Sequence, residues 1–367
     1  MLLKKTGMVI SLTAAMVAPG FSNITNIVSD KYSLGPDTYT QQIGGVSIIN
    51  LMSDGHLKPY AFINSFKSHS WPDLWFSLID LKDRKKVNGS SYDYASTNTY
   101  GATSSTNINI QLKGQDSKKP YIAEVHSGYD TKKLYFDLIA PWETSQKEAL
   151  VINKTLTHGR FPEITAVNVD GKDMIAEIHR SSNQENHNNY YDLIDPRTGK
   201  LVVNHQYDHT RYPIHSISTI QYDSKPAIYV SSPDHEYKIL DPKTGDIIKE
   251  GHMNHAIKGW VDNTYGFSVC HSAHCESYVL LQEDELLDNG HLRHYLDVVN
   301  AQTNQLMQKD YLGATYQEKG NRIISGKLAL TAHPVDVGTE ALNIVETYKS
   351  DYSIIVNQID MTVPLYR

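Results

Sequence analysis

The stretch Tyr237–Ile248, YKILDPKTGDII, decides the fold of this chain. It reads as a β-strand, a tight turn and a second strand, because proline presets φ at the second turn position and glycine supplies positive φ at the exit. The phrase occurs one unit earlier at Tyr190–Val202, YYDLIDPRTGKLV. Two copies of one strand–turn–strand phrase indicate a repeat protein.

Weaker copies of the phrase extend the repeat through most of the chain. They end at Asp80, Ala140, Asn300 and Glu346, so the units recur about every 46 to 60 residues. That period is typical of four-stranded blades arranged radially. The sequence therefore predicts an all-β fold, a single β-propeller over residues 23–367, with six blades favoured and seven as the alternative.

The two ends of the chain bear on the number of blades. Segments 23–44 and 358–367 lie outside the six counted units. One of them could supply a closing strand to the opposite end of the ring and so remove a free sheet edge. Alternatively, the two tails together build a degenerate seventh blade.

Composition and the N-terminus restrict the functional class. The formal net charge is −7 and no long basic run occurs, which argues against nucleic-acid binding. Residues 1–22 have the pattern of a secretory signal peptide, with Lys4 and Lys5 before a short apolar core and small residues near Gly20. This core is too short for a membrane span. We expect a periplasmic or secreted protein without stable membrane insertion.

The only two cysteines, Cys270 and Cys275, lie five positions apart. In an exported chain they favour a local disulfide. Free thiols and a metal site built with His271 and His274 are the alternatives, although four ligands within six residues would crowd one another. No metal ligand is assigned.

The strand pattern and the phrase Leu240–Gly245, LDPKTG, resemble the PQQ-like β-propeller repeat family. The resemblance covers most of residues 45–357, but only the third and fourth units match well. It implies the fold and not the chemistry. The family's quinone-dependent members carry a tryptophan where this chain has Val203 and Lys249, and an adjacent-cysteine feature that is missing here. No PQQ and no other cofactor is expected.

Aligning the units on the turn between their first two strands places histidines at one repeat position. His126 and His179 fall there, and His333 falls there in the sixth unit, beside Ser65, Ser232 and Cys270 in the others. Glu124 and Glu177 precede the first two histidines by two positions, on the same side of each strand. Internal duplication explains these pairs as simply as acid–base catalysis does.

Other basic residues are expected at the same end of the ring, in the connections between units. Arg160 and Arg211 precede aromatic-proline pairs at matching starts of two units, and further histidines flank them at His158, His205, His209, His252 and His255. Together with the repeat-position histidines they predict a polar funnel at one end of the channel. The residues assigned to ligand binding are His126, His179, His333, Arg160, Arg211, His205, His209 and His255.

Three interpretations of this funnel stay open at the level of sequence. It could bind an acidic or sugar-like ligand, it could bind a divalent metal, or its histidines only cap strand ends. We favour an exported binding module for a protein or carbohydrate ligand. The alternative is a metal-assisted lyase or hydrolase acting on an acidic sugar or lactone. Oligomeric state and enzymatic activity are left open.

Overall fold

The computed structural model describes the protein in fifteen segments. They cover residues 23–33, 41–67, 73–93, 103–128, 132–143, 146–183, 187–209, 216–232, 235–253, 260–271, 274–286, 292–316, 327–336, 339–350 and 353–364. The predicted signal peptide, residues 1–22, lies outside them. Within these segments we find no helix that combines the length and the apolar character needed to cross a membrane.

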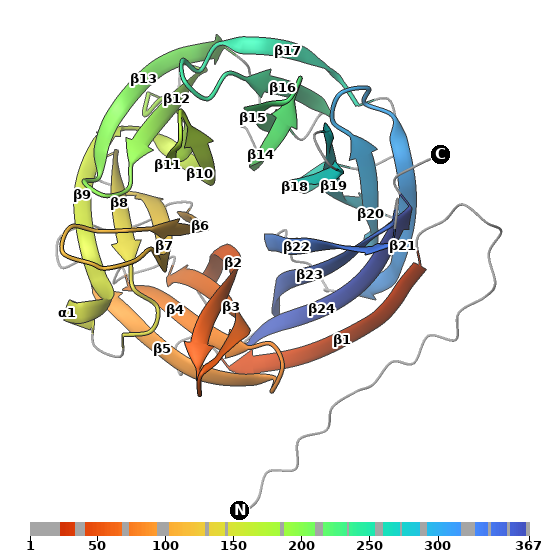
Figure 1. The fold of residues 1–367 in the computed structure, drawn as a ribbon, viewed down its shortest axis with the longest axis horizontal. Helices are drawn as coiled ribbons and strands as arrows, with labels where there is room; N and C mark the ends of the chain where they lie inside the picture. Colours follow the sequence, from red (N-terminus) through yellow and green to blue (C-terminus); the bar gives the residue numbers. More distant parts are fainter. Residues whose placement is uncertain are drawn as a thin grey trace, which may run out of the picture.

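The described strands form six four-stranded antiparallel sheets arranged around a central axis (Figure 1). The fold is thus a six-bladed β-propeller, as the repeat period predicts. In each blade, strands A to D run from the centre outward. The one described helix, α1 (Gln146–Ala149), is a single turn before the outer strand of blade 2.

Each blade contributes four strands, which follow one another from A to D. Blade 1 has β2 (Gln41–Ser53), β3 (His56–Lys67), β4 (Asp73–Asp80) and β5 (Lys85–Asp93). Blade 2 has β6 (Thr103–Ile110), β7 (Lys119–Ser127), β8 (Lys133–Ile139) and β9 (Leu150–His158). Blade 3 has β10 (Arg160–Val169), β11 (Lys172–Arg180), β12 (Asn188–Asp195) and β13 (Lys200–His209). Blade 4 has β14 (Ser216–Tyr222), β15 (Lys225–Ser231), β16 (Glu236–Leu240) and β17 (Ile247–His252). Blade 5 has β18 (Trp260–His271), β19 (His274–Leu286), β20 (Leu292–Asn300) and β21 (Leu306–Tyr316). Blade 6 has β22 (Lys327–Asp336), β23 (Thr339–Ser350), β24 (Ser353–Pro364) and β1 (Asn23–Ser33).

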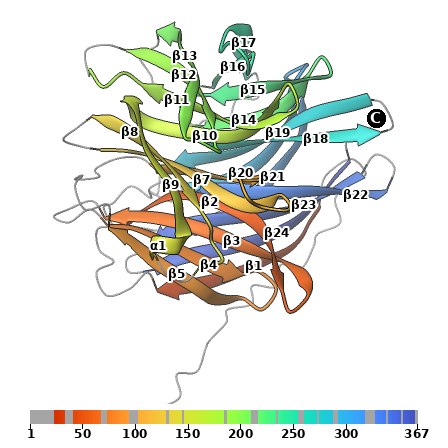
Figure 2. The same cartoon turned by 60° about the vertical axis from the view of Figure 1, so that its left-hand side comes forward.

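The ring is closed by its N-terminal strand. Strand β1 pairs antiparallel with β24 from Asn23 opposite Thr362 to Ser33 opposite Ser353, and so forms the outer strand of the last blade (Figures 1 and 2). The Arg84 guanidinium in the β4–β5 turn of blade 1 pairs with Asp30 of β1, with Nη2 2.6 Å from Oδ1. The prediction of a closing strand from one terminus is confirmed, and the seventh blade is not formed.

Closure from the N-terminus shifts the strand assignment of the sixth unit by one. The predicted third strand ending at Glu346 is the second strand, β23, and β24 takes the third place. His333 consequently lies on the innermost strand β22, opposite Ala341, and not on a second strand. The error arose because this unit has no Asp-Pro-x-Thr-Gly turn to mark the order of its strands.

The fifth unit also departs from expectation. Residues 274–286 form one long strand, β19. Cys270 lies on the inner strand β18, and the residue that corresponds to His126 in this blade is Glu283, opposite Tyr295. Two glutamates and one aspartate at residues 283–285 gave the segment a helical composition, but its ladder partners on both sides hold it extended.

The turns after the third strands have the geometry that their sequences predict. Asp195 accepts the amide N–H of Arg197 at its Oδ1, and Gly199 has φ +66°. Asp241 and Gly245 repeat this arrangement in blade 4, with φ +81° at the glycine. A carboxylate that caps the turn and a glycine that leaves it explain why these two copies are the clearest in the sequence.

The hydrophobic core is divided among the contacts between neighbouring blades. Six clusters of buried apolar side chains lie in the described residues, one at each junction of the ring. Tyr191 shows how a junction is fixed, since its ring is buried in blade 3 while its hydroxyl donates to the Pro242 carbonyl of blade 4 at 2.6 Å. Each blade therefore buries both faces, which explains the continuous apolar runs of the second and third strands.

The disulfide stays a prediction that the register of β18 and β19 supports. Cys270 is directly opposite Cys275 in this ladder, and Cβ atoms of such pairs lie about 4.5–5.5 Å apart. Reduction should raise the intact mass of the exported protein by two hydrogen atoms. The Cys270→Ser/Cys275→Ser variant should lose about 2 kcal/mol of unfolding free energy. Two titratable thiols in folded, non-reduced protein would contradict this.

A second prediction concerns ring closure. A chain that begins after Ser33 lacks β1 and exposes the edge of β24, so we expect a melting temperature lower by roughly 5 °C or more and concentration-dependent aggregation. A chain that begins at Asn23 is the control. Equal melting temperatures and monodisperse behaviour of the two proteins in light scattering would show that β1 does not hold the ring.

Candidate functional site

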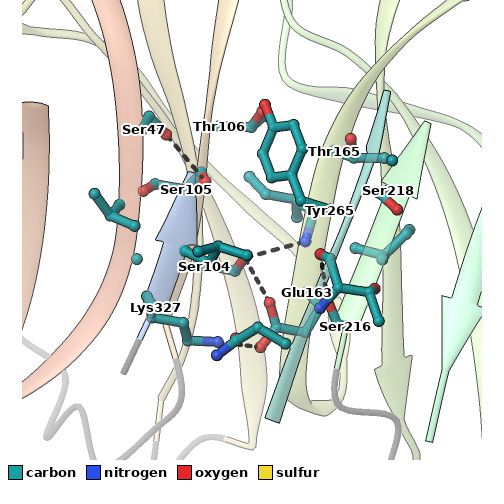
Figure 3. A pocket seen from close by; sticks show the side chains of 18 of the residues that line it. Ser47, Ser104, Ser105, Thr106, Glu163, Thr165, Ser216, Ser218, Tyr265 and Lys327 are labelled. Carbon is teal, nitrogen blue, oxygen red and sulfur yellow. Dashed lines mark hydrogen bonds and ion pairs between the residues drawn. The ribbon is translucent and has the colours of Figure 1, made fainter. Parts of the chain in front are cut away.

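A polar cavity of about 160 Å³ lies on the axis of the ring. All six inner strands line it, and Figure 3 shows the side chains that they contribute. Those with polar groups are Ser47, Ser104, Ser105, Thr106, Glu163, Thr165, Ser216, Ser218, Thr219, Asn263, Thr264, Tyr265 and Lys327. The lining is rich in hydroxyl groups and has one cationic and one acidic side chain.

Serine hydroxyls join neighbouring inner strands around this cavity. Ser104 Oγ accepts the amide N–H of Ile164 in the next blade at 3.2 Å. Ser216 Oγ does the same for Thr264 at 3.0 Å and donates to the Thr264 carbonyl at 2.9 Å. The inner strands of adjacent blades belong to different sheets, so these side chains satisfy backbone groups that would otherwise be buried without partners.

An ion pair spans the channel near the starts of the inner strands. Lys327 Nζ of blade 6 lies 2.7 Å from Glu163 Oε1 of blade 3, the blade opposite in the ring. Ser104 Oγ donates to the second carboxylate oxygen, Oε2, at 2.9 Å (Figure 3). The side chains of Lys327 and Glu163 are 21% and 16% exposed, so the pair is largely shielded from water.

Further along the channel the lining changes from charged to hydroxyl and aromatic groups. Ser47 Oγ donates to the Ser105 carbonyl at 3.3 Å. Ser218 Oγ is buried, and no described residue is its hydrogen-bond partner. Tyr265 faces this part of the cavity (Figure 3), and burial raises the pKa of its phenol. A polar ligand at this level would meet a hydroxyl group that lacks a partner and one aromatic ring.

Blade 2 contains a buried cluster of one histidine and two carboxylates. His126 Nδ1 lies 3.2 Å from Asp137 Oδ2 and 3.7 Å from Glu124 Oε1. All three side chains are at most 1% exposed. Burial, and next the charge of Asp137, raise the pKa of Glu124 to about 7, while His126 opposes the shift.

Blade 3 repeats this cluster at equivalent positions. His179 Nδ1 lies 2.9 Å from Glu177 Oε2 and 3.8 Å from Asp192 Oδ2. Burial and the neighbouring Glu177 raise the pKa of Asp192 to about 7. Burial lowers the pKa of His179, but Glu177 and Asp192 outweigh it, so this pKa lies above its usual value.

The structure therefore places the predicted funnel residues differently from the sequence interpretation. His126 and His179 share one end of the ring but are buried in the clusters, and neither lines the cavity. His205 is on β13, the outer strand of blade 3, which lies far from the axis in Figure 1, and its Nε2 is 3.4 Å from Asp246 Oδ1. Arg160 starts the inner strand β10 without lining the cavity. The alternation of strand B turns the histidines toward the neighbouring blade and away from the channel.

Two predicted residues, and the side chains of two others, lie beyond what the structure describes. Arg211 and His255 are outside the described residues. The backbone positions of His209 and His333 are described, on β13 and β22, but their side chains are not. The ligand-binding assignment of these residues stays a prediction.

Sequence analysis missed the residues that line the cavity and the carboxylates that complete the clusters. Asp137 and Asp192 interrupt otherwise apolar third strands at the same position, in YFDLI and YYDLI. An ionisable residue repeated inside a buried strand was the available signal. No comparable signal marks Glu163 and Lys327, because they are far apart in sequence and meet only when the ring closes.

Comparisons with known proteins give no assignment. No protein-family model matches the chain, and a search of curated proteins finds no similar sequence. The site must therefore be interpreted from its own geometry.

A third prediction tests the ion pair across the channel. Replacing Lys327 with alanine leaves Glu163 largely buried beside one serine donor, so we expect a loss of about 1–3 kcal/mol in a denaturant titration. Lys243→Ala removes the exposed pair with Asp170, at 2.8 Å, and should change stability little.

A double-mutant cycle isolates the interaction. The Glu163→Gln change should cost less when Lys327 is already alanine than in the parent protein. Additive effects of the two changes would show that the ion pair does not form in solution.

Proposed function

We propose that this protein is an exported β-propeller binding module that recognises a carbohydrate unit in its axial cavity. The observation that carries the proposal is the composition of the lining, in which hydroxyl groups from the inner strands surround one aromatic ring, one amide and one ion pair. Sugars present hydroxyl groups around a partly apolar ring, and sites with a few placed polar groups and an aromatic surface suit them.

The size of the cavity suits part of one sugar unit. A volume of about 160 Å³ corresponds to about five water molecules at the roughly 30 Å³ that each occupies in the liquid. The cavity would therefore take the hydroxyl-bearing edge of one sugar ring. A folded protein partner would need a protruding side chain or loop to use the same cavity, and no described feature favours it over a sugar.

The groups that would contact the ligand are Ser218, Tyr265 and the Glu163–Lys327 pair. Ser218 Oγ supplies a donor or acceptor that no described residue uses. Tyr265 supplies an apolar face, and the ion pair offers charged partners to the ligand hydroxyls, which make stronger hydrogen bonds than neutral ones.

The alternative of a metal-assisted lyase or hydrolase receives less support. Its acid and base candidates, His126 and His179 with their glutamates, are buried between blades and do not line the cavity. A group that must exchange a proton with a substrate has to reach it within hydrogen-bond distance.

Export is the other component of this proposal. It rests on the signal-like segment 1–22, which lies outside the described residues, and on the opposed cysteines. N-terminal sequencing of the exported protein should find a start between residues 19 and 23.

Calorimetric titration of a panel of mono- and disaccharides tests the ligand. Ser218→Ala should weaken the best ligand by roughly 3- to 10-fold, which corresponds to one lost hydrogen bond. It should not destabilise the fold, because Ser218 Oγ makes no hydrogen bond within the described chain. Ser53→Ala, at the tip of the β2–β3 hairpin, is the control and should bind as the parent does.

Two results would reject the assignment. One is that no saccharide of the panel binds. The other is that Ser218→Ala and Tyr265→Leu both bind the best ligand with parental affinity, which would place its site outside the cavity.

A further inference from the structure

The buried histidine–carboxylate clusters of blades 2 and 3 take no part in the axial cavity. Each consists of a glutamate and a histidine two positions apart on strand B and an aspartate on strand C: Glu124, His126 and Asp137 in one blade, and Glu177, His179 and Asp192 in the other. We propose that each cluster is a structural binding site for one divalent transition-metal ion of the zinc type.

The charges of each cluster favour a divalent cation. In blade 3 the carboxyl groups of Glu177 and Asp192 face each other, and Glu177 Oε1 and Asp192 Oδ2 are buried with no donor among the described residues. Two ionised carboxylates cannot donate to each other, so the pair needs either added protons or a cation between them. One divalent cation with a neutral imidazole makes the cluster electrically neutral, whereas protons alone must number two.

The distances suit this interpretation. Ligand atoms about 2.0–2.2 Å from a tetrahedral zinc ion lie roughly 3.4 Å from one another. His126 Nδ1 is 3.2 and 3.7 Å from its two carboxylates, and His179 Nδ1 is 2.9 and 3.8 Å from its own. These values bracket the required separation, and in both blades one donor atom of each of the three residues lies within 4.8 Å of the others.

Neighbouring side chains orient the ligands in the same way in both blades. Asn153 Nδ2 donates to Asp137 Oδ1 at 2.8 Å, and Asn204 Nδ2 donates to Asp192 Oδ1 at 2.6 Å. The other aspartate oxygen, Oδ2, is the one near the histidine in each case. Partners that hold the outer oxygen of a ligand carboxylate are a regular feature of metal sites.

Aromatic rings fix the imidazole planes as well. Tyr135 stacks on His126 with 5.2 Å between ring centroids, and Tyr190 stacks on His179 at 5.3 Å. Both histidines are thus held with Nδ1 toward the carboxylates, which is the arrangement that a ligand nitrogen requires.

Blade 6 provides an internal comparison without a histidine. Glu346 is the equivalent of Glu177, because it is opposite Asn357 as Glu177 is opposite Asp192. Its carboxylate accepts from the amides of Gln282 and Asn357, and Tyr348 has the position of the histidine. Here the buried carboxylate has neutral donors, so no ion is needed, and blade 6 serves as the control.

The experiment uses the full exported chain without an affinity tag. It is incubated with excess Zn²⁺, desalted and analysed for metal by mass spectrometry, and its melting temperature is recorded with and without zinc. We expect two zinc ions per chain in the parent protein and in Glu346→Gln. We expect one in Glu124→Gln and one in Glu177→Gln, because an amide in place of the carboxylate removes a charged ligand. Zinc should raise the melting temperature of the parent more than that of either single variant.

Either of two results would overturn the proposal. One is a zinc content below about 0.2 per chain in the loaded parent protein. The other is an equal zinc content in the parent and in the Glu124→Gln/Glu177→Gln double variant. If these variants do not fold, Co²⁺ loading of the parent decides alone. Visible absorption of nitrogen- and oxygen-coordinated cobalt at two equivalents supports the sites, and its absence shows that the clusters share protons instead.

Discussion

The pairing of β1 with β24 is the constraint on which the remaining structure depends. It joins the first described strand of the chain to the last, and it completes the only blade whose strands are not consecutive in sequence. Every other strand pair joins consecutive strands, and the junction between blades 1 and 6 is the other place where the two ends of the chain meet. Without this pairing, blade 6 has three strands and a free edge along β24.

Closure also explains where polar groups can be buried. Each blade packs both faces against its neighbours, so a polar residue in strand B or C faces another blade and not water. At one position of strand C, the blades provide different partners for the buried polar side chain. Asp137 and Asp192 pair with asparagines of strand D. Lys238, at the equivalent place in blade 4, lies 2.7 Å from Asp208 of blade 3 and 3.8 Å from Glu250 of its own blade. The register tolerates a polar residue that finds a partner in its own blade or the next.

How much of this the sequence could predict depends on the range of each signal. The Asp195–Gly199 turn, the repeat period and the need to cover a free edge are local or periodic, and they were sufficient for a six-bladed ring closed by a terminal strand. The sixth unit was displaced because it has no Asp-Pro-x-Thr-Gly turn. The partnership of Glu124 with His126 was visible as spacing, but its burial was not. The direction in which a strand residue points relative to the axis depends on the ring, and no local pattern encodes it.

The two groups of charged residues consequently have different consequences for function. Glu163 and Lys327 come from opposite blades, so the distance between them follows the geometry of the whole ring and can change when a ligand enters. The clusters of Glu124 and Glu177 are each built within one blade, from adjacent strands in a fixed register, and they follow only that blade. Glu124 is opposite Ser105 of β6 and Glu177 is opposite Ile164 of β10, so each cluster adjoins an inner strand that lines the cavity. Under the proposed function, the clusters would influence binding through the position of these strands and without touching the ligand.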